Sequence, residues 1–155
     1  MSLSSPRLWR CIAMAERPTI TNELLQRMTD AVVQAIEPEW VILFGSQAKG
    51  TARPTSDIDF LVVEAEPFGP ERSRRKEAAK VWRVLAKFGI PTDVLMYSLE
   101  EIAEWQHSPN HVIACALQEG QVMYERSKAG ENVAFGRAPR FAGLERNAES
   151  GSICR

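Results

Sequence analysis

Residues 45–63 read Gly-Ser-Gln-Ala-Lys-Gly-Thr-Ala-Arg-Pro-Thr-Ser-Asp-Ile-Asp-Phe-Leu-Val-Val. A Gly-Ser pair follows a short hydrophobic run, residues 40–44, and two aspartates, Asp57 and Asp59, stand at the head of a second hydrophobic run. Short apolar runs bounded by glycine, proline and other turn residues are typical of buried strands. The stretch therefore predicts strands at 40–44 and 57–63, joined by a loop that carries polar groups at both ends.

The two aspartates are predicted to act together. In a strand, residues two apart point to the same face, so Asp57 and Asp59 project side by side. Adjacent carboxylates repel each other unless a cation lies between them. Mg²⁺ prefers oxygen ligands and typically takes one or two carboxylates together with substrate phosphates. Because an Asp-x-Asp pair alone is more often a solvated strand end, its interpretation depends on the loop before it.

The loop has the features of a phosphate-binding segment. Gly45 allows the backbone to turn and to approach a ligand closely. The amides that follow Ser46 can bind an anion at the start of a short helix, and Lys49 adds a positive charge one turn later. A Gly-Ser pair alone is usually only a turn with a helix cap. A P-loop is excluded, because Thr51 stands after the second glycine, Gly50, where that motif requires lysine.

A third carboxylate lies in the next predicted strand. Asp93 falls within residues 90–97, an otherwise apolar run that predicts a strand. A lone aspartate near a strand start is more often a residue of the adjoining loop. Its place one strand after the Asp-x-Asp pair makes Asp93 the candidate to join Asp57 and Asp59 in a catalytic site.

The rest of the chain alternates between helical and strand patterns. Apolar spacing and capping residues predict helices at 20–36, 71–88, 98–106 and 108–119, and a last strand at 121–124. For the last of these helices, Ser108 is the expected N-cap and Pro109 the first helical residue. In the helix at 71–88, five side chains are expected to face the core: those of Ala78, Val81, Trp82, Leu85 and Phe88.

Two further side-chain groups allow more than one interpretation. Trp82 and Trp105 are most simply core residues, although an exposed aromatic side chain would suit a partner interface. A basic run opens the helix at 71–88 with Arg72, Arg74, Arg75 and Lys76. A solvated face is the usual interpretation of such a run, and a contact with a partner or with ATP is the alternative.

The length of 155 residues and the absence of repeats indicate one domain. The predicted division is a loose N-terminal extension at 1–19, a domain at 20–127 and a poorly ordered tail at 128–155. The net charge of −1 excludes a general polycation for nucleic acid, and no segment is long enough to span a bilayer. The three cysteines lack metal-ligand spacing, and their odd number fits a reducing cytoplasm.

The combined motif resembles that of the minimal nucleotidyltransferases, and more narrowly the MNT-type antitoxins paired with HEPN-domain toxins. The resemblance covers about residues 22–126. The matching positions are Gly45-Ser46, Lys49-Gly50, Ser56 before Asp57-Ile58-Asp59, and the later Asp93.

The resemblance implies an α/β fold (α+β) of the DNA polymerase β-like type, a mixed sheet flanked by helices. It implies that Asp57, Asp59 and Asp93 bind Mg²⁺, two ions in all, and that Asp93 also helps to deprotonate the acceptor hydroxyl. It further implies an ATP site. The residues expected to hold the nucleotide are Gly45, Ser46, Lys49 and Ser56.

The function implied is that of a cytoplasmic antitoxin enzyme. It would transfer AMP from ATP to a tyrosine hydroxyl of a partner HEPN ribonuclease toxin, with neither membrane nor nucleic acid bound directly. Two alternatives stay open. One is a stand-alone transferase acting on a small hydroxylated molecule such as an aminoglycoside, although such enzymes usually add a helical domain and little sequence follows residue 127. The other is a non-catalytic module that masks a toxin, although a pure binder has no need of three aspartates that repel one another.

Overall fold

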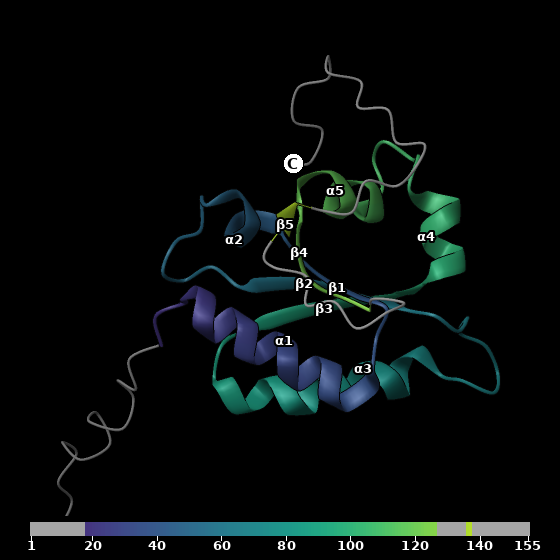
Figure 1. Cartoon of the computed structure of the whole chain (residues 1–155), viewed down its shortest axis with the longest axis horizontal. Coiled ribbons are helices and arrows are strands. Elements are labelled where there is room, and N and C mark those ends of the chain that lie inside the picture. The colour runs from purple at the N-terminus through teal and green to yellow at the C-terminus, as the bar shows by residue number, and fades with distance from the viewer. Residues whose placement is uncertain (1–17, 127–135, 138–155) are drawn as a thin grey trace, which may run out of the picture.

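A mixed β-sheet with the strand order β3-β2-β1-β4-β5 forms the centre of the protein, as the computed structural model shows (Figure 1). The structure describes residues 18–126 and 136–137. The strands are β1 (Trp40–Phe44), β2 (Ile58–Glu64), β3 (Thr92–Ser98), β4 (Gln121–Glu125) and β5 (Gly136–Arg137). The helices are α1 (Asn22–Ile36), α2 (Gly45–Lys49), α3 (Arg74–Leu85), the 3₁₀ turn η1 (Ala86–Phe88), α4 (Leu99–Trp105) and α5 (Val112–Glu119).

The strand directions bring distant segments to one end of the sheet. β1 is antiparallel to both β2 and β4, whereas β2 and β3 are parallel. A parallel pair needs a long crossover connection, and α3 with η1 supplies it. The end of β1 therefore meets the starts of β2 and β3, and the loop between β1 and β2 begins at the same place.

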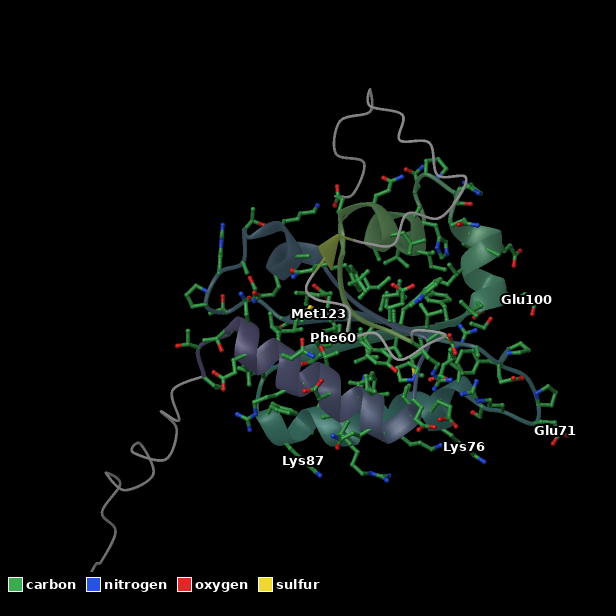
Figure 2. The ribbon with its side chains drawn as sticks, viewed as in Figure 1. Phe60, Glu71, Lys76, Lys87, Glu100 and Met123 are labelled. Atoms are coloured by element: carbon green, nitrogen blue, oxygen red, sulfur yellow. The ribbon has the colours of Figure 1, made fainter. Side chains whose placement is uncertain are left out.

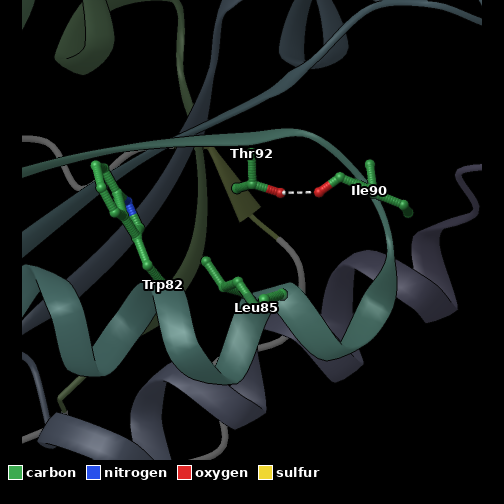
Figure 3. A pocket seen from close by; sticks show the side chains of 5 residues that line it. Trp82, Leu85, Ile90 and Thr92 are labelled. Atoms are coloured by element: carbon green, nitrogen blue, oxygen red, sulfur yellow. Dashed lines mark hydrogen bonds between the residues drawn. The ribbon is translucent and has the colours of Figure 1, made fainter.

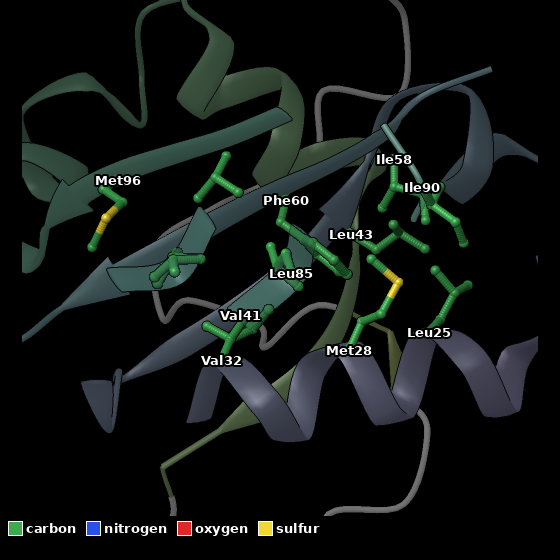
Figure 4. Packing of buried hydrophobic residues seen from close by; sticks show 13 residues of the cluster. Leu25, Met28, Val32, Val41, Leu43, Ile58, Phe60, Leu85, Ile90 and Met96 are labelled. Carbon is green, nitrogen blue, oxygen red and sulfur yellow. The ribbon is translucent and has the colours of Figure 1, made fainter. Parts of the chain in front are cut away.

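Helices cover both faces of the sheet (Figure 1). One apolar cluster packs α1 and α3 against alternate strand residues such as Phe60 and Val62, as Figure 4 shows around Phe60. A second cluster packs α4 and α5 against the opposite face, which includes Leu61 and Val63. Because both of its faces are covered, β2 is hydrophobic along almost its whole length. The mixed sheet flanked by helices confirms the predicted fold class.

The predicted start of the last helix is wrong. The backbone N–H of His111 donates to the Ser108 carbonyl at 3.0 Å, which closes a turn where the helix was expected to begin. The helix α5 begins instead at Val112, and His111 is its N-cap, with Nδ1 accepting a hydrogen bond from the Ile113 amide at 3.3 Å. Pro109 lies in the turn rather than at the first helical position.

The predicted burial of two tryptophans is also wrong. Trp82 is 56% exposed and Trp105 is 39% exposed. In α3, Val81 and Leu85 are buried in the cluster that α1 and the sheet also form, and Trp82 lies outside this buried stripe of the helix. Trp105 is the last residue of α4 and stacks on His111, with ring centroids 4.8 Å apart.

Most of the predicted N-terminal extension (1–19) and C-terminal tail (128–155) lies outside the described residues, although β5 pairs with β4 at Gly136 and Arg137. None of the helices at 22–119 is both long and apolar enough to cross a membrane. The described residues do not test the predicted reducing cytoplasm, which stays a prediction.

Candidate active site

The three predicted aspartates meet at the end of the sheet where β2 and β3 begin. Asp59 is the second residue of β2 and lies directly beside Asp93 in the parallel register with β3. Both alternate with residues that pack under α4 and α5, such as Leu61 and Leu95, so the two carboxylates share that face of the sheet. Asp57 comes immediately before β2.

The electrostatics of Asp59 show that all three carboxylates interact. Burial raises the pKa of Asp59, and the negative charges of Asp93 and then Asp57 raise this pKa further. Asp59 is half-buried, whereas Asp57 and Asp93 are exposed. A cation held among these groups would offset their mutual repulsion, since an opposite charge nearby favours the ionised form of a carboxylate.

The donor set fits a divalent cation that shares its ligands with a substrate. No group of three or more His, Cys, Asp or Glu side chains converges as a metal cage within residues 18–126. The three aspartates offer only carboxylate oxygens. Mg²⁺ in nucleotide-dependent enzymes commonly has such a partial set, with one or two carboxylates and the remaining positions filled by phosphates and water.

Gly45 brings the loop into contact with this cluster. It ends β1 and opens α2, its φ is +71°, and the residue before it, Phe44, lies opposite Asp59 in the antiparallel register. A Cβ atom on Gly45 would overlap the Asp59 Oδ2 atom and lie 3.2 Å from its Cγ atom. The backbone of the predicted phosphate loop therefore lies directly against the central carboxylate, and a side chain there would separate the two.

Ser46 is the second residue of α2 and is half-buried. No side chain caps the N-terminus of α2 with a hydrogen bond, so the first amides of this short helix are available to an acceptor from outside.

Lys49 and Ser56 already have partners. The Lys49 Nζ atom lies 2.6 Å from the Glu119 Oε2 atom, which ties α2 to the end of α5. The Ser56 Oγ atom accepts a hydrogen bond from the Arg53 amide at 2.8 Å and so fixes the turn before Asp57. Their roles in nucleotide binding stay predictions. Glu119 was not singled out in the sequence, because its pairing with a residue 70 positions earlier leaves no local pattern.

A family model of the nucleotidyltransferase domain matches residues 25–117. This span includes all seven candidate site residues: Gly45, Ser46, Lys49, Ser56, Asp57, Asp59 and Asp93. No curated protein matches the chain in sequence.

Solved structures with a similar fold include a candidate nucleotidyltransferase from Sulfolobus solfataricus. It is 20% identical, with a TM-score of 0.44 over 72% of this chain and 86% of that one. A toxin–antitoxin complex with AMP-PNP contains a chain with 21% identity and a TM-score of 0.42, over 64% of this chain and 73% of that one. A chain from the complex of the tri-AMPylated Shewanella oneidensis HEPN toxin with MNT antitoxin is 17% identical. Its TM-score is 0.41, and the match covers 68% of this chain and 73% of that one. These similarities concern the fold alone.

Proposed function

The chain belongs to the nucleotidyltransferase domain family, and on this premise we propose that it is a Mg²⁺-dependent antitoxin enzyme that transfers AMP from ATP to a tyrosine of a partner HEPN ribonuclease toxin. The observation that carries the proposal is the register of the parallel strands, which sets Asp59 beside Asp93 while Gly45 packs against Asp59. This arrangement supports the proposal, because the loop at Gly45 and the carboxylates of Asp59 and Asp93 lie next to one another.

Each residue has a role that its position supports. Asp57 and Asp59 would hold Mg²⁺, which supplies charge neutralisation of the phosphates and of the leaving group when bound. The backbone at Gly45 and Ser46 would hold the triphosphate, because a glycine there permits the closest approach of a ligand. Asp93 is exposed and therefore reachable by an acceptor that arrives from solvent.

The reaction forms one bond and breaks one. The tyrosine oxygen attacks the α-phosphorus of ATP, the bond from that phosphorus to the bridging oxygen of the β-phosphate breaks, and pyrophosphate leaves. Asp93 accepts the proton of the tyrosine hydroxyl. Most of the catalysis is positioning and charge neutralisation, as is general for transfer at phosphorus.

The tyrosine acceptor is named from the resemblance of the motif to MNT-type antitoxins. One such antitoxin has been solved in complex with its AMPylated HEPN toxin. The AMP added to the toxin would bring negative charge and bulk to its ribonuclease site, and so neutralise it. Because ATP is a substrate, the proposal places the protein in the cytoplasm.

The test is a transfer assay with radiolabelled ATP, Mg²⁺ and the protein encoded beside this chain's gene. We expect label on a tyrosine of that protein. The double variant Asp57→Ala, Asp59→Ala is expected to give no label, and Asp93→Asn to slow transfer by about 10²–10⁴-fold, the usual contribution of a general base. Asp30→Ala is the matched control, because Asp30 is an exposed aspartate on α1, outside the site, and its loss should change nothing.

The alternatives have different outcomes in the same system. If folded wild-type protein transfers no label to the partner, the proposal is wrong. Transfer of label to an added aminoglycoside instead would identify an enzyme that acts on small molecules. If the double variant still protects cells from the toxin as well as the wild type does, the protein masks its partner rather than modifying it.

A further inference from the structure

A pocket opens between the C-terminal part of α3 and the start of β3 (Figure 3). It has a volume of about 210 Å³ and is lined by Trp82, Leu85, Ala86, Ile90 and Thr92. Four of these side chains are apolar, and the hydroxyl of the fifth, Thr92, already donates to the Ile90 carbonyl at 3.0 Å. Trp82 is the most exposed large hydrophobic residue among those described. The protein therefore presents an apolar hollow with an aromatic wall to solvent.

The pocket lies beside an open strand edge. β3 is the end strand of the sheet, and none of the described strands pairs with its outer side. An edge strand carries backbone N–H and C=O groups that an extended chain from another protein can pair with. No proline interrupts residues 92–98, so the outer edge keeps all of its backbone donors.

The pocket and the candidate active site are one residue apart along this edge. Thr92 lines the pocket on the α3 side, and Asp93 points to the opposite face, where Asp59 lies. Side chains of an extended chain paired with β3 would alternate between the same two faces. A residue of that chain in the pocket would therefore have a neighbour in front of the carboxylates.

The outer side of the helical segment that carries the pocket residues Trp82, Leu85 and Ala86 is basic. Lys76 and Arg83 on α3 and Lys87 on η1 are exposed and have no ion-pair partner within residues 18–126. Figure 2 shows Lys76 and Lys87 pointing away from the sheet along the outer side of α3. These charges complement an acidic partner and would speed its association.

We propose that the pocket and the outer edge of β3 dock the acceptor segment of the partner protein. The occupant is an extended, acidic stretch of polypeptide that pairs with β3, places an aliphatic or aromatic side chain against Trp82, and presents the adjacent tyrosine to Asp93. The inference rests on the proposed function in that the acceptor is a protein. A polypeptide fits better than RNA, because the open strand edge beside the pocket can pair with a peptide backbone, which a sugar-phosphate backbone cannot imitate.

The test uses Trp82→Ala and Ala86→Glu, two changes at exposed residues of the pocket that leave the aspartates untouched. Transfer is measured with the full chain, ATP, Mg²⁺ and the protein encoded beside its gene. We expect the KM for that protein to rise roughly 10- to 50-fold, as for the loss of an aromatic anchor. The KM for ATP and the kcat at saturating acceptor should stay within about twofold of wild type, because only acceptor binding is weakened.

Trp105→Ala is the matched control, since Trp105 is an exposed tryptophan on α4, which covers the opposite face of the sheet. It should leave the acceptor KM unchanged, and thermal unfolding confirms that every variant folds. Hydrogen exchange supplies a second measurement: outward amides of residues 92–98 should exchange more slowly in the complex. An unchanged acceptor KM in both pocket variants, or unchanged exchange along β3 in the complex, overturns the inference.

Failure of the proposed function has a separate signature. If wild-type protein labels no acceptor, the affinity of the same pair is measured by calorimetry. If Trp82→Ala then binds the partner more weakly and Trp105→Ala does not, the docking surface is supported although the transfer reaction is not. If a labelled single-stranded oligouridine binds the wild type and not Trp82→Ala, the surface takes nucleic acid and the inference is wrong.

Discussion

At the scale of single residues, both the backbone conformation and the surroundings of Gly45 require glycine. Its φ of +71° lies in the left-handed region, and the Asp59 carboxylate occupies the place where a Cβ atom would stand. Gly50 has the same φ of +71° but has no atom within 4 Å of that place. Substitutions at the two glycines can therefore be compared to separate the energetic cost of the left-handed backbone from the cost of the clash with Asp59.

Gly45→Ala is expected to lower both stability and activity. The left-handed conformation alone costs about 1–2 kcal/mol with a side chain, and Gly50→Ala should show this loss while keeping its transfer rate. Gly45→Ala should lose more than Gly50→Ala and should also lose transfer, because the new methyl group displaces Asp59. Urea unfolding and the transfer assay measure both. Equal effects of the two substitutions would contradict the role assigned to the contact.

Asp59 is expected to destabilise the metal-free protein at neutral pH. Its pKa is raised, so the folded state binds the proton more tightly than the unfolded state does. Stability therefore falls as pH rises from 3.8, the ordinary value, through the raised pKa, and the loss persists above it. Asp59→Asn should stabilise the metal-free protein at pH 7 by no more than about 1 kcal/mol, since the group is only half-buried.

Thermal unfolding at pH 7 and below pH 3.8 checks this sign. The gain from Asp59→Asn should shrink at the lower pH, where the wild-type carboxyl group is protonated in both states. Asp30→Asn, an exposed control on α1, should show no gain at either pH. Added Mg²⁺ should raise the melting temperature of the wild type more than that of Asp59→Asn. A variant that melts below the wild type at pH 7 would refute the assignment.

At the scale of elements, α4 is defined by a capping box. The Glu101 amide donates to the Ser98 Oγ atom at 3.3 Å, and the Ser98 amide donates to the Glu101 Oε2 atom at 2.9 Å. Ser98→Ala should lower the free energy of unfolding by about 1 kcal/mol, the usual cost of losing an N-cap. Ser98→Thr keeps the hydroxyl and should recover part of the loss. Denaturant unfolding measures both, and equal stability of Ser98→Ala and wild type would contradict the prediction.

Local signals predicted the elements better than they predicted contacts. The strand at 40–44 has the predicted bounds, and the helix predicted at 98–106 is found as α4 with Ser98 as its N-cap, because both elements depend on neighbouring residues. The start of α5 was missed because a tight turn competed with the Ser-Pro signal at residues 108–109. The exposure of Trp82 was missed because periodicity gives the apolar side of a helix but not how much of that side other elements cover.

The same distinction applies to the candidate site. Asp59 and Asp93 lie side by side because β2 and β3 are consecutive parallel strands, and their proximity can therefore be predicted from the sequence. The ion pair of Lys49 with Glu119 does not, because it depends on how α5 packs beside α2. Sequence spacing therefore indicates which groups gather, and tertiary packing decides which of them are already engaged.

At the scale of the whole molecule, an ion pair between a buried glutamate and a half-buried arginine lies at the end of the sheet away from the aspartates. Glu64 ends β2 and is 4% exposed, and its Oε2 atom lies 2.5 Å from an Arg72 nitrogen. Arg72 also donates to the Glu66 carbonyl at 3.0 Å and stacks over Phe68. Arg74 pairs with Glu101 of α4. The basic run was interpreted as a solvated face, and for Arg72, which is half-buried, that interpretation is wrong.

Arg72→Met should destabilise the protein by roughly 3 kcal/mol, because it leaves the Glu64 carboxylate buried without its partner. The double variant Arg72→Met, Glu64→Leu should recover much of this loss, since removing both charges removes the desolvation penalty. Arg75→Met is the control, as Arg75 is exposed. Chemical denaturation measures all of them. A single variant as stable as the control would show that Glu64 does not need Arg72.

The parallel pairing of β2 with β3 also bears on how the candidate active site assembles during folding. The two strands meet only after the chain has closed the long loop through α3, and such non-local pairings are slow to form. Helices and the β1–β2 hairpin depend on contacts closer in sequence and can form first. Asp57 and Asp59 therefore belong to the part of the sheet that contacts close in sequence can build, whereas Asp93 joins them only when β3 pairs with β2, and the three aspartates cannot act together before that pairing.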